Sequence, residues 1–304
     1  MKICLLKIVI TVFFIFMFVI ETLACDTLKV KSNLGNDTLM AASEIHVVND
    51  SFDTDTANFL KGFFKDHLAL WKSPLKMNAK KYLFWAPVLV STAICFRNDE
   101  RIHSSFNDFQ SKNSWVGKVS PVITDIGSTR VILGTTMIFY GVGVLFNNTK
   151  AKQTGVMAVQ ALGHAAIIVT AGKLITGRER PSYNNGISTW HWFPSSLKQF
   201  GSDPQPKYNS FPSGHTIAVW SVATVIAKQY RKTIIIPVLA YGLATGVGLS
   251  RVVEDAHWLS DVVVGAALGF TIGSFVVKMH KNTRWMLFPT SNGKNFMIAG
   301  TYRL

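Results

Sequence analysis

Six apolar runs, separated by short polar loops, constrain the fold of this 304-residue chain more than any other feature of its sequence. Each run is long enough to form a helix, so we expect all six to be helical. The chain is therefore predicted to be all-α, a bundle of about six core helices that is partly transmembrane. In chain order the runs cover residues 82–96, 131–146, 155–175, 217–227, 234–249 and 258–277.

The lengths of these runs bear on whether they cross a bilayer. Run 258–277 is long enough, whereas run 234–249 extends over roughly 24 Å against about 30 Å for a hydrocarbon core. Run 82–96 is the weakest candidate, because it is short and contains Pro87. Five of the six runs are therefore expected to cross, although a soluble exported bundle remains the alternative.

The net charge indicates which partners the chain can have. Its 31 Lys and Arg residues against 17 Asp and Glu residues give a formal charge of +14, which suits an anionic partner. Neither a basic-aromatic repeat nor zinc-finger spacing is present, so we expect a membrane and no nucleic acid. The basic loops at 150–152, 228–232 and 278–284 fall on one side of an up-and-down bundle, which is typical of a cytoplasmic face.

The first 24 residues have the pattern of a secretory signal peptide. Lys2 and Lys7 precede an apolar core, and the small residues Thr22 and Ala24 stand where a cleavage site would need them. An uncleaved anchor helix is the alternative. Lipidation at Cys25 is less favoured, because Thr22 stands where a lipoprotein junction usually has Leu.

Three short segments carry the residues suited to catalysis, on the side of the bundle opposite the basic loops. The first is Lys173 followed, after six residues, by Arg180 and Pro181; the second is PSGH, residues 212–215. The third is Ser250-Arg251, then His257 after five residues and Asp261 after three more. Each segment alone is a weak signal, but their order and spacing together are a strong one.

In these three segments the chain resembles the type-2 phosphatidic acid phosphatase superfamily. That superfamily includes bacterial class A acid phosphatases, membrane lipid phosphatases and vanadium haloperoxidases. Every signature position matches, over roughly residues 80–280. The resemblance suggests four parts: the signal peptide 1–24, a polar extension 25–79 with an amphipathic helix, a phosphatase domain 80–284 and a tail 285–304. The tail's last ten residues alternate like a short strand without an obvious partner.

The residue types in the signature suit phosphoryl transfer, in which charge must be stabilised on the phosphoryl oxygens. Lys173, Arg180 and Arg251 supply three cations, so neither a metal nor another cofactor is expected. Ser213 is predicted to be the N-cap of a helix whose N–H groups bind an oxyanion. Gly214 allows the backbone to approach that anion closely.

The two signature histidines are expected to divide the chemistry. The resemblance implies that His257 is the nucleophile and forms a phosphohistidine. Asp261, one helical turn further on, is positioned to accept a hydrogen bond from the other ring nitrogen and fix the tautomer. His215 would protonate the leaving group and later activate water. Arg178 and Glu179 lie inside the first segment but hold no signature position, and Glu179 is expected to pair with a neighbouring cation.

The expected function is a phosphatase acting on a lipid phosphate, in a bacterial inner membrane with the active site on the periplasmic side. A soluble periplasmic acid phosphatase of broad specificity is the alternative. A non-enzymatic membrane protein with a vestigial site is less favoured, because the signature is intact. Aromatic residues in the loop 182–211 either pack over the site or lie at the membrane interface, among them Tyr183, Trp190, Trp192, Phe193 and Tyr208.

Overall fold

The computed structural model describes residues 52–72, 79–183, 185–193, 195–196, 207–282, 285–291 and 296–302. The predicted signal peptide and most of the polar extension lie outside these residues. All six apolar runs are helical, as the sequence predicts. The helices are α2 (Phe52–Lys72), α3 (Ala79–Lys112), α4 (Ser114–Ile126), α5 (Thr129–Leu145), α6 (Thr149–Thr176), η2 (Pro181–Tyr183), α8 (Gly214–Gln229), α9 (Ile235–Val253) and α10 (Leu259–Asn282).

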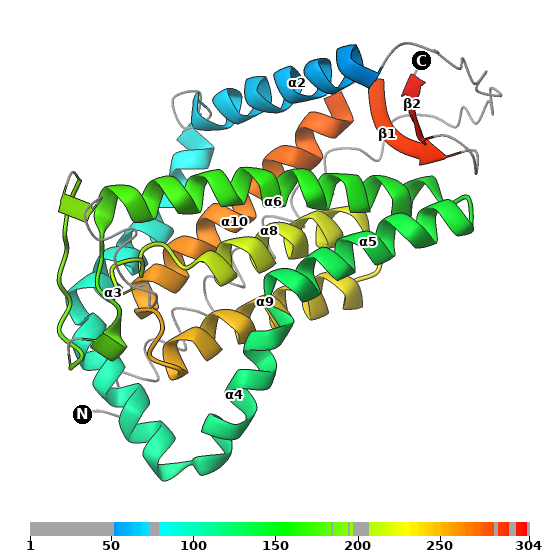
Figure 1. The fold of residues 1–304 in the computed structure, drawn as a ribbon. Helices are drawn as coiled ribbons and strands as arrows, with labels where there is room; N and C mark the ends of the chain where they lie inside the picture. Colours follow the sequence, from blue (N-terminus) through cyan, green and yellow to red (C-terminus); the bar gives the residue numbers. More distant parts are fainter. Residues whose placement is uncertain are drawn as a thin grey trace.

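Helix α8 forms the centre of the bundle. It lies between α6, α9 and α10 in Figure 1 and packs against all three. Its side chains are buried on several faces, with Ile217, Trp220 and Val225 at most 1% exposed. A helix that is apolar all round fits such a central position. The PSGH segment leads directly into this helix, so the core of the fold fixes where that segment lies.

Close packing between α10 and α8 depends on three glycines spaced four residues apart. A Cβ at Gly265 would lie 3.0 Å from Thr216 Cβ, and one at Gly269 would lie 2.7 Å from the Ile217 carbonyl oxygen. At Gly273 a Cβ would lie 2.5 Å from the Ser221 carbonyl oxygen. Small residues at this spacing allow two helix backbones to approach closely.

The predicted amphipathic helix is confirmed as α2, which packs against the bundle through one face. Phe63 stacks on His164 of α6 with ring centroids 4.3 Å apart. The His67 and His164 Nδ1 atoms are 3.1 Å apart, and Trp71 Nε1 donates to His67 Nε2 at 2.9 Å. Because that indole N–H only donates, a neutral His67 carries its proton on Nδ1 and donates to His164.

Within the part of the chain that the structure describes, three helices are long and apolar enough to cross a membrane, namely α6, α9 and the 259–280 part of α10. The bent pair α4 and α5, which meet at 47°, would make a fourth. The prediction of five crossings therefore exceeds what the described helices offer. The difference lies in α8, whose 16 residues are too short, and in α5, which reaches the required length only together with α4.

Two elements, helix α4 and strand β1 (Trp285–Ser291), were not expected from the sequence. Helix α4 contains Pro121 and lies between two predicted helices. The tail does form the predicted strand, β2 (Phe296–Tyr302), and its partner is β1. The two pair antiparallel, with Trp285 opposite Tyr302. The bundle is all-α as predicted, and this hairpin follows it.

Candidate active site

The three signature segments meet at one end of the bundle. Lys173 lies in the last turn of α6, His215 in the first turn of α8, Arg251 in the last turn of α9 and Asp261 in the first turn of α10. These four helix ends lie together on the left in Figure 1. The three basic loops join or follow the opposite helix ends, so the two-sided arrangement expected from the sequence is present.

A glycine turn directs the first segment across the site. Gly177 ends α6 in the left-handed conformation with φ 47°, and its N–H donates to the Lys173 carbonyl at 3.0 Å. A Cβ there would lie 2.3 Å from the His191 carbonyl oxygen, so a side chain is excluded for steric as well as conformational reasons. After this turn the chain runs alongside the loop 182–211. Arg178 and Trp190 form an isolated antiparallel β-bridge there.

His257 is buried and held in one tautomer by the backbone. Its Nδ1 lies 2.7 Å from the Ser210 carbonyl oxygen, which can only accept, so Nδ1 carries the proton and Nε2 carries a lone pair. Burial lowers the pKa of His257 to about 3, with Arg180 and Lys173 acting in the same direction and Asp261 opposing them. The imidazole is therefore neutral at physiological pH, as a nucleophile requires.

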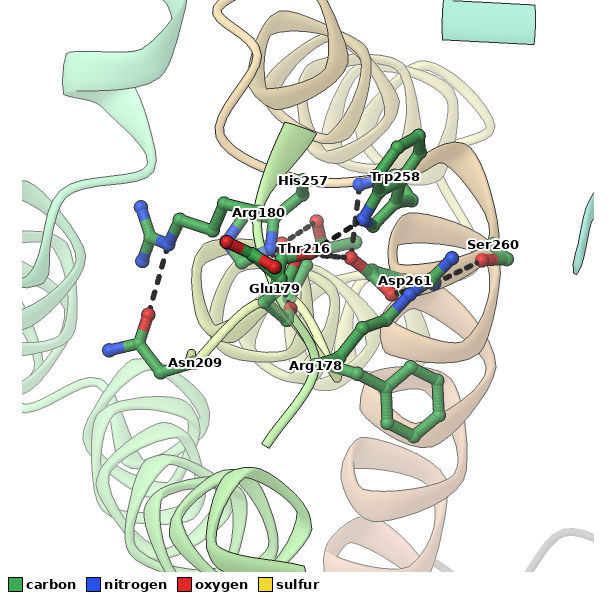
Figure 2. A network of polar contacts seen from close by, with 12 residues as sticks. Arg178, Glu179, Arg180, Asn209, Thr216, His257, Trp258, Ser260 and Asp261 are labelled. Atoms are coloured by element: carbon green, nitrogen blue, oxygen red, sulfur yellow. Dashed lines mark hydrogen bonds and ion pairs between the residues drawn. The ribbon is translucent and has the colours of Figure 1, made fainter. Parts of the chain in front are cut away.

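Asp261 acts on His257 less directly than the spacing suggested. Its Oδ2 is 3.7 Å from His257 Nδ1, beyond hydrogen-bond distance, and the Ser210 carbonyl accepts instead. The same oxygen accepts from Ser210 Oγ at 2.6 Å and from the Trp258 N–H at 3.0 Å. By reaching back to the residue that precedes α10, the carboxylate caps the helix in the manner of a capping box. Figure 2 shows the contact between Asp261 and Trp258.

His215 shares its charged surroundings with His257. Burial lowers the pKa of His215 to about 4, and Arg251, Lys173 and Arg180 lower it further. Lys173 and Arg180 also act on His257, so both imidazoles face one group of cations. A Cβ placed on Gly214 would lie 3.8 Å from Lys173 Nζ, which puts the lysine beside the start of α8. Positive side chains and a helix N-terminus together form an anion site.

Ser213 is the N-cap of α8 as predicted, but its side chain does not cap the helix. The hydroxyl instead pairs with Thr216 Oγ1 at 2.8 Å and is fully buried in this structure. The Ser213 N–H donates to the Asp261 carbonyl at 3.3 Å. The second and third signature segments are therefore joined by a direct backbone hydrogen bond.

Residues outside the signature hold the side chains of its two arginines in place. Arg180 Nε donates to Asn209 Oδ1 at 2.9 Å, as drawn in Figure 2. Arg251 donates through Nη1 to Glu254 Oε2 at 2.5 Å. Its buried Nε has no hydrogen-bond partner among the described residues. Thr124 of α4 donates to Glu254 Oε1 at 2.7 Å, so the unexpected helix α4 supports this arginine through Glu254.

Sequence reasoning missed the role of the most buried cation of the site, Arg178, which is 1% exposed. Its guanidinium bridges Asp261 of α10 and Asp99 of α3 (Figure 2 shows the Asp261 side). Burial raises the pKa of Asp99, while Arg178 and Ser260 act against that rise. The only hint in the sequence is that Asp99 follows shortly after an apolar run. Glu179 pairs with Lys207 Nζ at 2.7 Å, which confirms the predicted ion pair.

Of the non-signature histidines, His103 lies nearest to the third segment. Its Nε2 is 2.7 Å from Asp255 Oδ1, so it has a structural partner. Among the residues that the structure describes, no group of three or more His, Cys, Asp or Glu side chains is placed to hold a metal ion.

The fold and site define a class: a helical bundle with candidate membrane spans, in which two imidazoles and three cations surround a helix N-terminus at one end. Residues 154–285, which contain all three signature segments, match the model of the PAP2 superfamily. Over this part of the chain the match confirms the resemblance seen in the signature segments.

Similar proteins are found among bacteria and fungi. A lipid A 1-phosphatase of Porphyromonas gingivalis is 34% identical over 128 residues, which are 41% of this chain and 24% of that protein. A probable diacylglycerol pyrophosphate phosphatase of Schizosaccharomyces pombe is 27% identical over 181 residues, 52% of this chain and 62% of that protein. The chain thus spans less than two thirds of either relative.

Among solved structures, a transmembrane PAP2-type phosphatidylglycerolphosphate phosphatase from Bacillus subtilis is similar, at 20% identity and a TM-score of 0.47. The alignment covers 73% of this chain and 95% of that one.

Proposed function

We propose that this chain is a metal-independent phosphatase that hydrolyses phosphate monoesters or pyrophosphates of membrane lipids through a phosphohistidine on His257. The single observation that carries the proposal is the hydrogen bond from His257 Nδ1 to the Ser210 carbonyl. It leaves the Nε2 lone pair of a buried, neutral imidazole beside the cations that would hold a phosphate.

The reaction then proceeds in two displacements. Nε2 of His257 attacks phosphorus, the bond to the leaving oxygen breaks, and a protonated His215 gives that oxygen its proton. In the second step water attacks phosphorus and His215 takes a proton from the water. The bond between phosphorus and Nε2 breaks, its electron pair returns to His257, and phosphate leaves. Lys173, Arg180 and Arg251 stabilise the charge on the phosphoryl oxygens through both steps, which is why no metal is needed in this proposal.

A lipid substrate is favoured by the surroundings of the site. The site lies at the ends of three helices that are long and apolar enough to cross a membrane. Of the loop aromatics, Trp190 packs over Arg178, whereas Trp192 and Phe193 are more than half exposed. The Phe193 N–H donates to Ile175 near the end of α6, so these exposed rings extend one candidate span. Aromatic rings are favoured at membrane interfaces.

The location follows from charge. The basic loops lie at the end opposite the site, and positive loops favour the cytoplasm. The proposed active site therefore faces the periplasm, at the outer surface of the inner membrane. The named relatives act on different lipids, lipid A and diacylglycerol pyrophosphate, so the proposal is limited to the lipid phosphate class.

Phosphate release tests this function. The purified chain in detergent would be assayed against lipid A, phosphatidic acid, diacylglycerol pyrophosphate and a soluble aryl phosphate. We expect release from at least one lipid at a higher kcat/KM than from the soluble ester, and a loss of about a thousandfold or more in His257→Ala. The matched control is His280→Asn, at the other end of α10, with unchanged rates. Equal activity in His257→Ala would refute the mechanism, and preference for the soluble ester would refute the lipid class.

A further inference from the structure

Arg178 is buried in the candidate active site, and none of its N–H donors is left to bind substrate. A guanidinium has five N–H donors. Nη1 donates to Ser260 Oγ at 2.7 Å and to Asp261 Oδ1 at 2.5 Å. Nη2 donates to Asp99 Oδ2 at 2.7 Å and to Ser188 Oγ at 2.9 Å, and Nε also points to Ser188 Oγ, at 3.3 Å. All five donors are occupied by protein acceptors, so Arg178 does not bind the phosphate.

Aromatic rings exclude water from this arginine. Its guanidinium carbon lies 4.6 Å from the centre of the Trp190 ring, and 5.2 Å from those of Phe96 and Trp258. In such a low-dielectric environment a charge is retained only with partners of opposite charge and good geometry. The planar fork of Arg meets two carboxylates at once, which the point charge of Lys cannot do in the same way.

A short chain of hydrogen bonds connects Arg178 to His257. Arg178 Nη1 fixes Asp261, and the other oxygen of Asp261 accepts from Ser210 Oγ at 2.6 Å. The Ser210 N–H donates to the Arg178 carbonyl at 3.0 Å. Ser210 is thus held at its side chain and at its backbone, and its own carbonyl is the acceptor for His257 Nδ1 at 2.7 Å.

We propose that Arg178 is a positioning residue, which acts through Asp261 and Ser210 to hold His257 with Nδ1 protonated and Nε2 free to attack. This inference rests on the proposed function and deepens it, because it assigns a role to two residues, Arg178 and Ser210, that hold no signature position. Ser210 is the last link, and its buried side chain offers the mildest way to disturb the chain of contacts.

Two serines of the network provide a matched pair for the test. Ser188 accepts a hydrogen bond from the Arg178 guanidinium, and Ser210 accepts one from His257 through its carbonyl. Both serines belong to the Arg178 network, but only Ser210 contacts His257. A positioning role predicts that kcat falls about tenfold in Ser210→Ala and about a hundredfold in Arg178→Lys, since a small displacement of a reacting group has effects of this size. KM and inhibition by inorganic phosphate should stay within about twofold, because the cations are unchanged, and so should kcat in Ser188→Ala.

The tautomer of His257 supplies a readout that does not depend on activity. The ¹⁵N chemical shifts of its ring should show one neutral tautomer in the unsubstituted chain and a second in Ser210→Ala and Arg178→Lys. If either folded variant kept kcat within twofold and the single tautomer, or if Ser188→Ala matched Ser210→Ala, Arg178 would be merely structural. Should Arg178→Lys fail to fold, Ser210→Ala decides alone. Activity in His257→Ala would refute the proposed function but not the positioning role. The ¹⁵N shifts of the His257 ring would still show whether Arg178 and Ser210 fix its tautomer.

Discussion

At the scale of single residues, the two histidines are held in different ways. His257 is fully enclosed, and a backbone carbonyl fixes its proton on Nδ1. His215 lies in the first turn of the central helix α8, where burial, and then Arg251, Lys173 and Arg180, disfavour its charged form. A neutral His257 suits nucleophilic attack at once, whereas His215 must gain a proton before it can act as an acid.

Anion binding should cause His215 to take up that proton from solvent. Burial and the nearby cations lower the pKa of His215 to about 4, so the ring is neutral at pH 6. A bound dianion favours the imidazolium and raises the pKa, so a proton is taken up on binding, and affinity falls as the pH rises. Sulfate is a suitable probe because it does not itself titrate in this range.

Calorimetry in two buffers of different ionisation enthalpy measures this uptake. We expect net proton uptake when sulfate binds at pH 6, and its loss in His215→Asn. Uptake of the same size in His215→Asn would assign the proton to another group and contradict the proposed role of His215 as acid.

At the scale of elements, the contact between α8 and α10 determines where the second and third segments lie. Ser213 precedes α8, His257 precedes α10, and the glycines 265, 269 and 273 set the distance between these helices. Lengthening that distance would separate the segments that surround the anion.

Gly269→Ala should therefore destabilise the chain. The added methyl group would lie 2.7 Å from the Ile217 carbonyl oxygen and 2.6 Å from Trp220 Cβ, neither of which can move without shifting a helix. Overpacking of this kind costs about 1–3 kcal/mol, seen as a lower Tm in detergent. Gly242→Ala in α9 is the control: nothing lies within 4 Å of its Cβ, and alanine favours helix. Equal Tm values for the two variants would show that the glycines do not set this contact.

At the scale of the whole molecule, the chain separates a basic end from the end that holds the candidate active site. The helices, and the meeting of the three signature segments at one end of the bundle, were predictable because apolar runs and motif spacing are properties of the sequence itself. The roles of Arg178, Asp99 and Ser210 were not, because they depend on α3, the loop and α10 meeting in space. For the same reason the spacing of His257 and Asp261 suggested a direct hydrogen bond, whereas the fold interposes the Ser210 carbonyl.

The measurement that tests the central claim most directly is the capture of the covalent intermediate. The chain would be mixed with a ³²P-labelled phosphate ester, quenched in base and digested. We predict a label that is stable in base and labile in acid, carried by the peptide that contains His257 and absent from His257→Ala. Continued phosphate release with no covalent label, or with the label on another residue, would contradict the account.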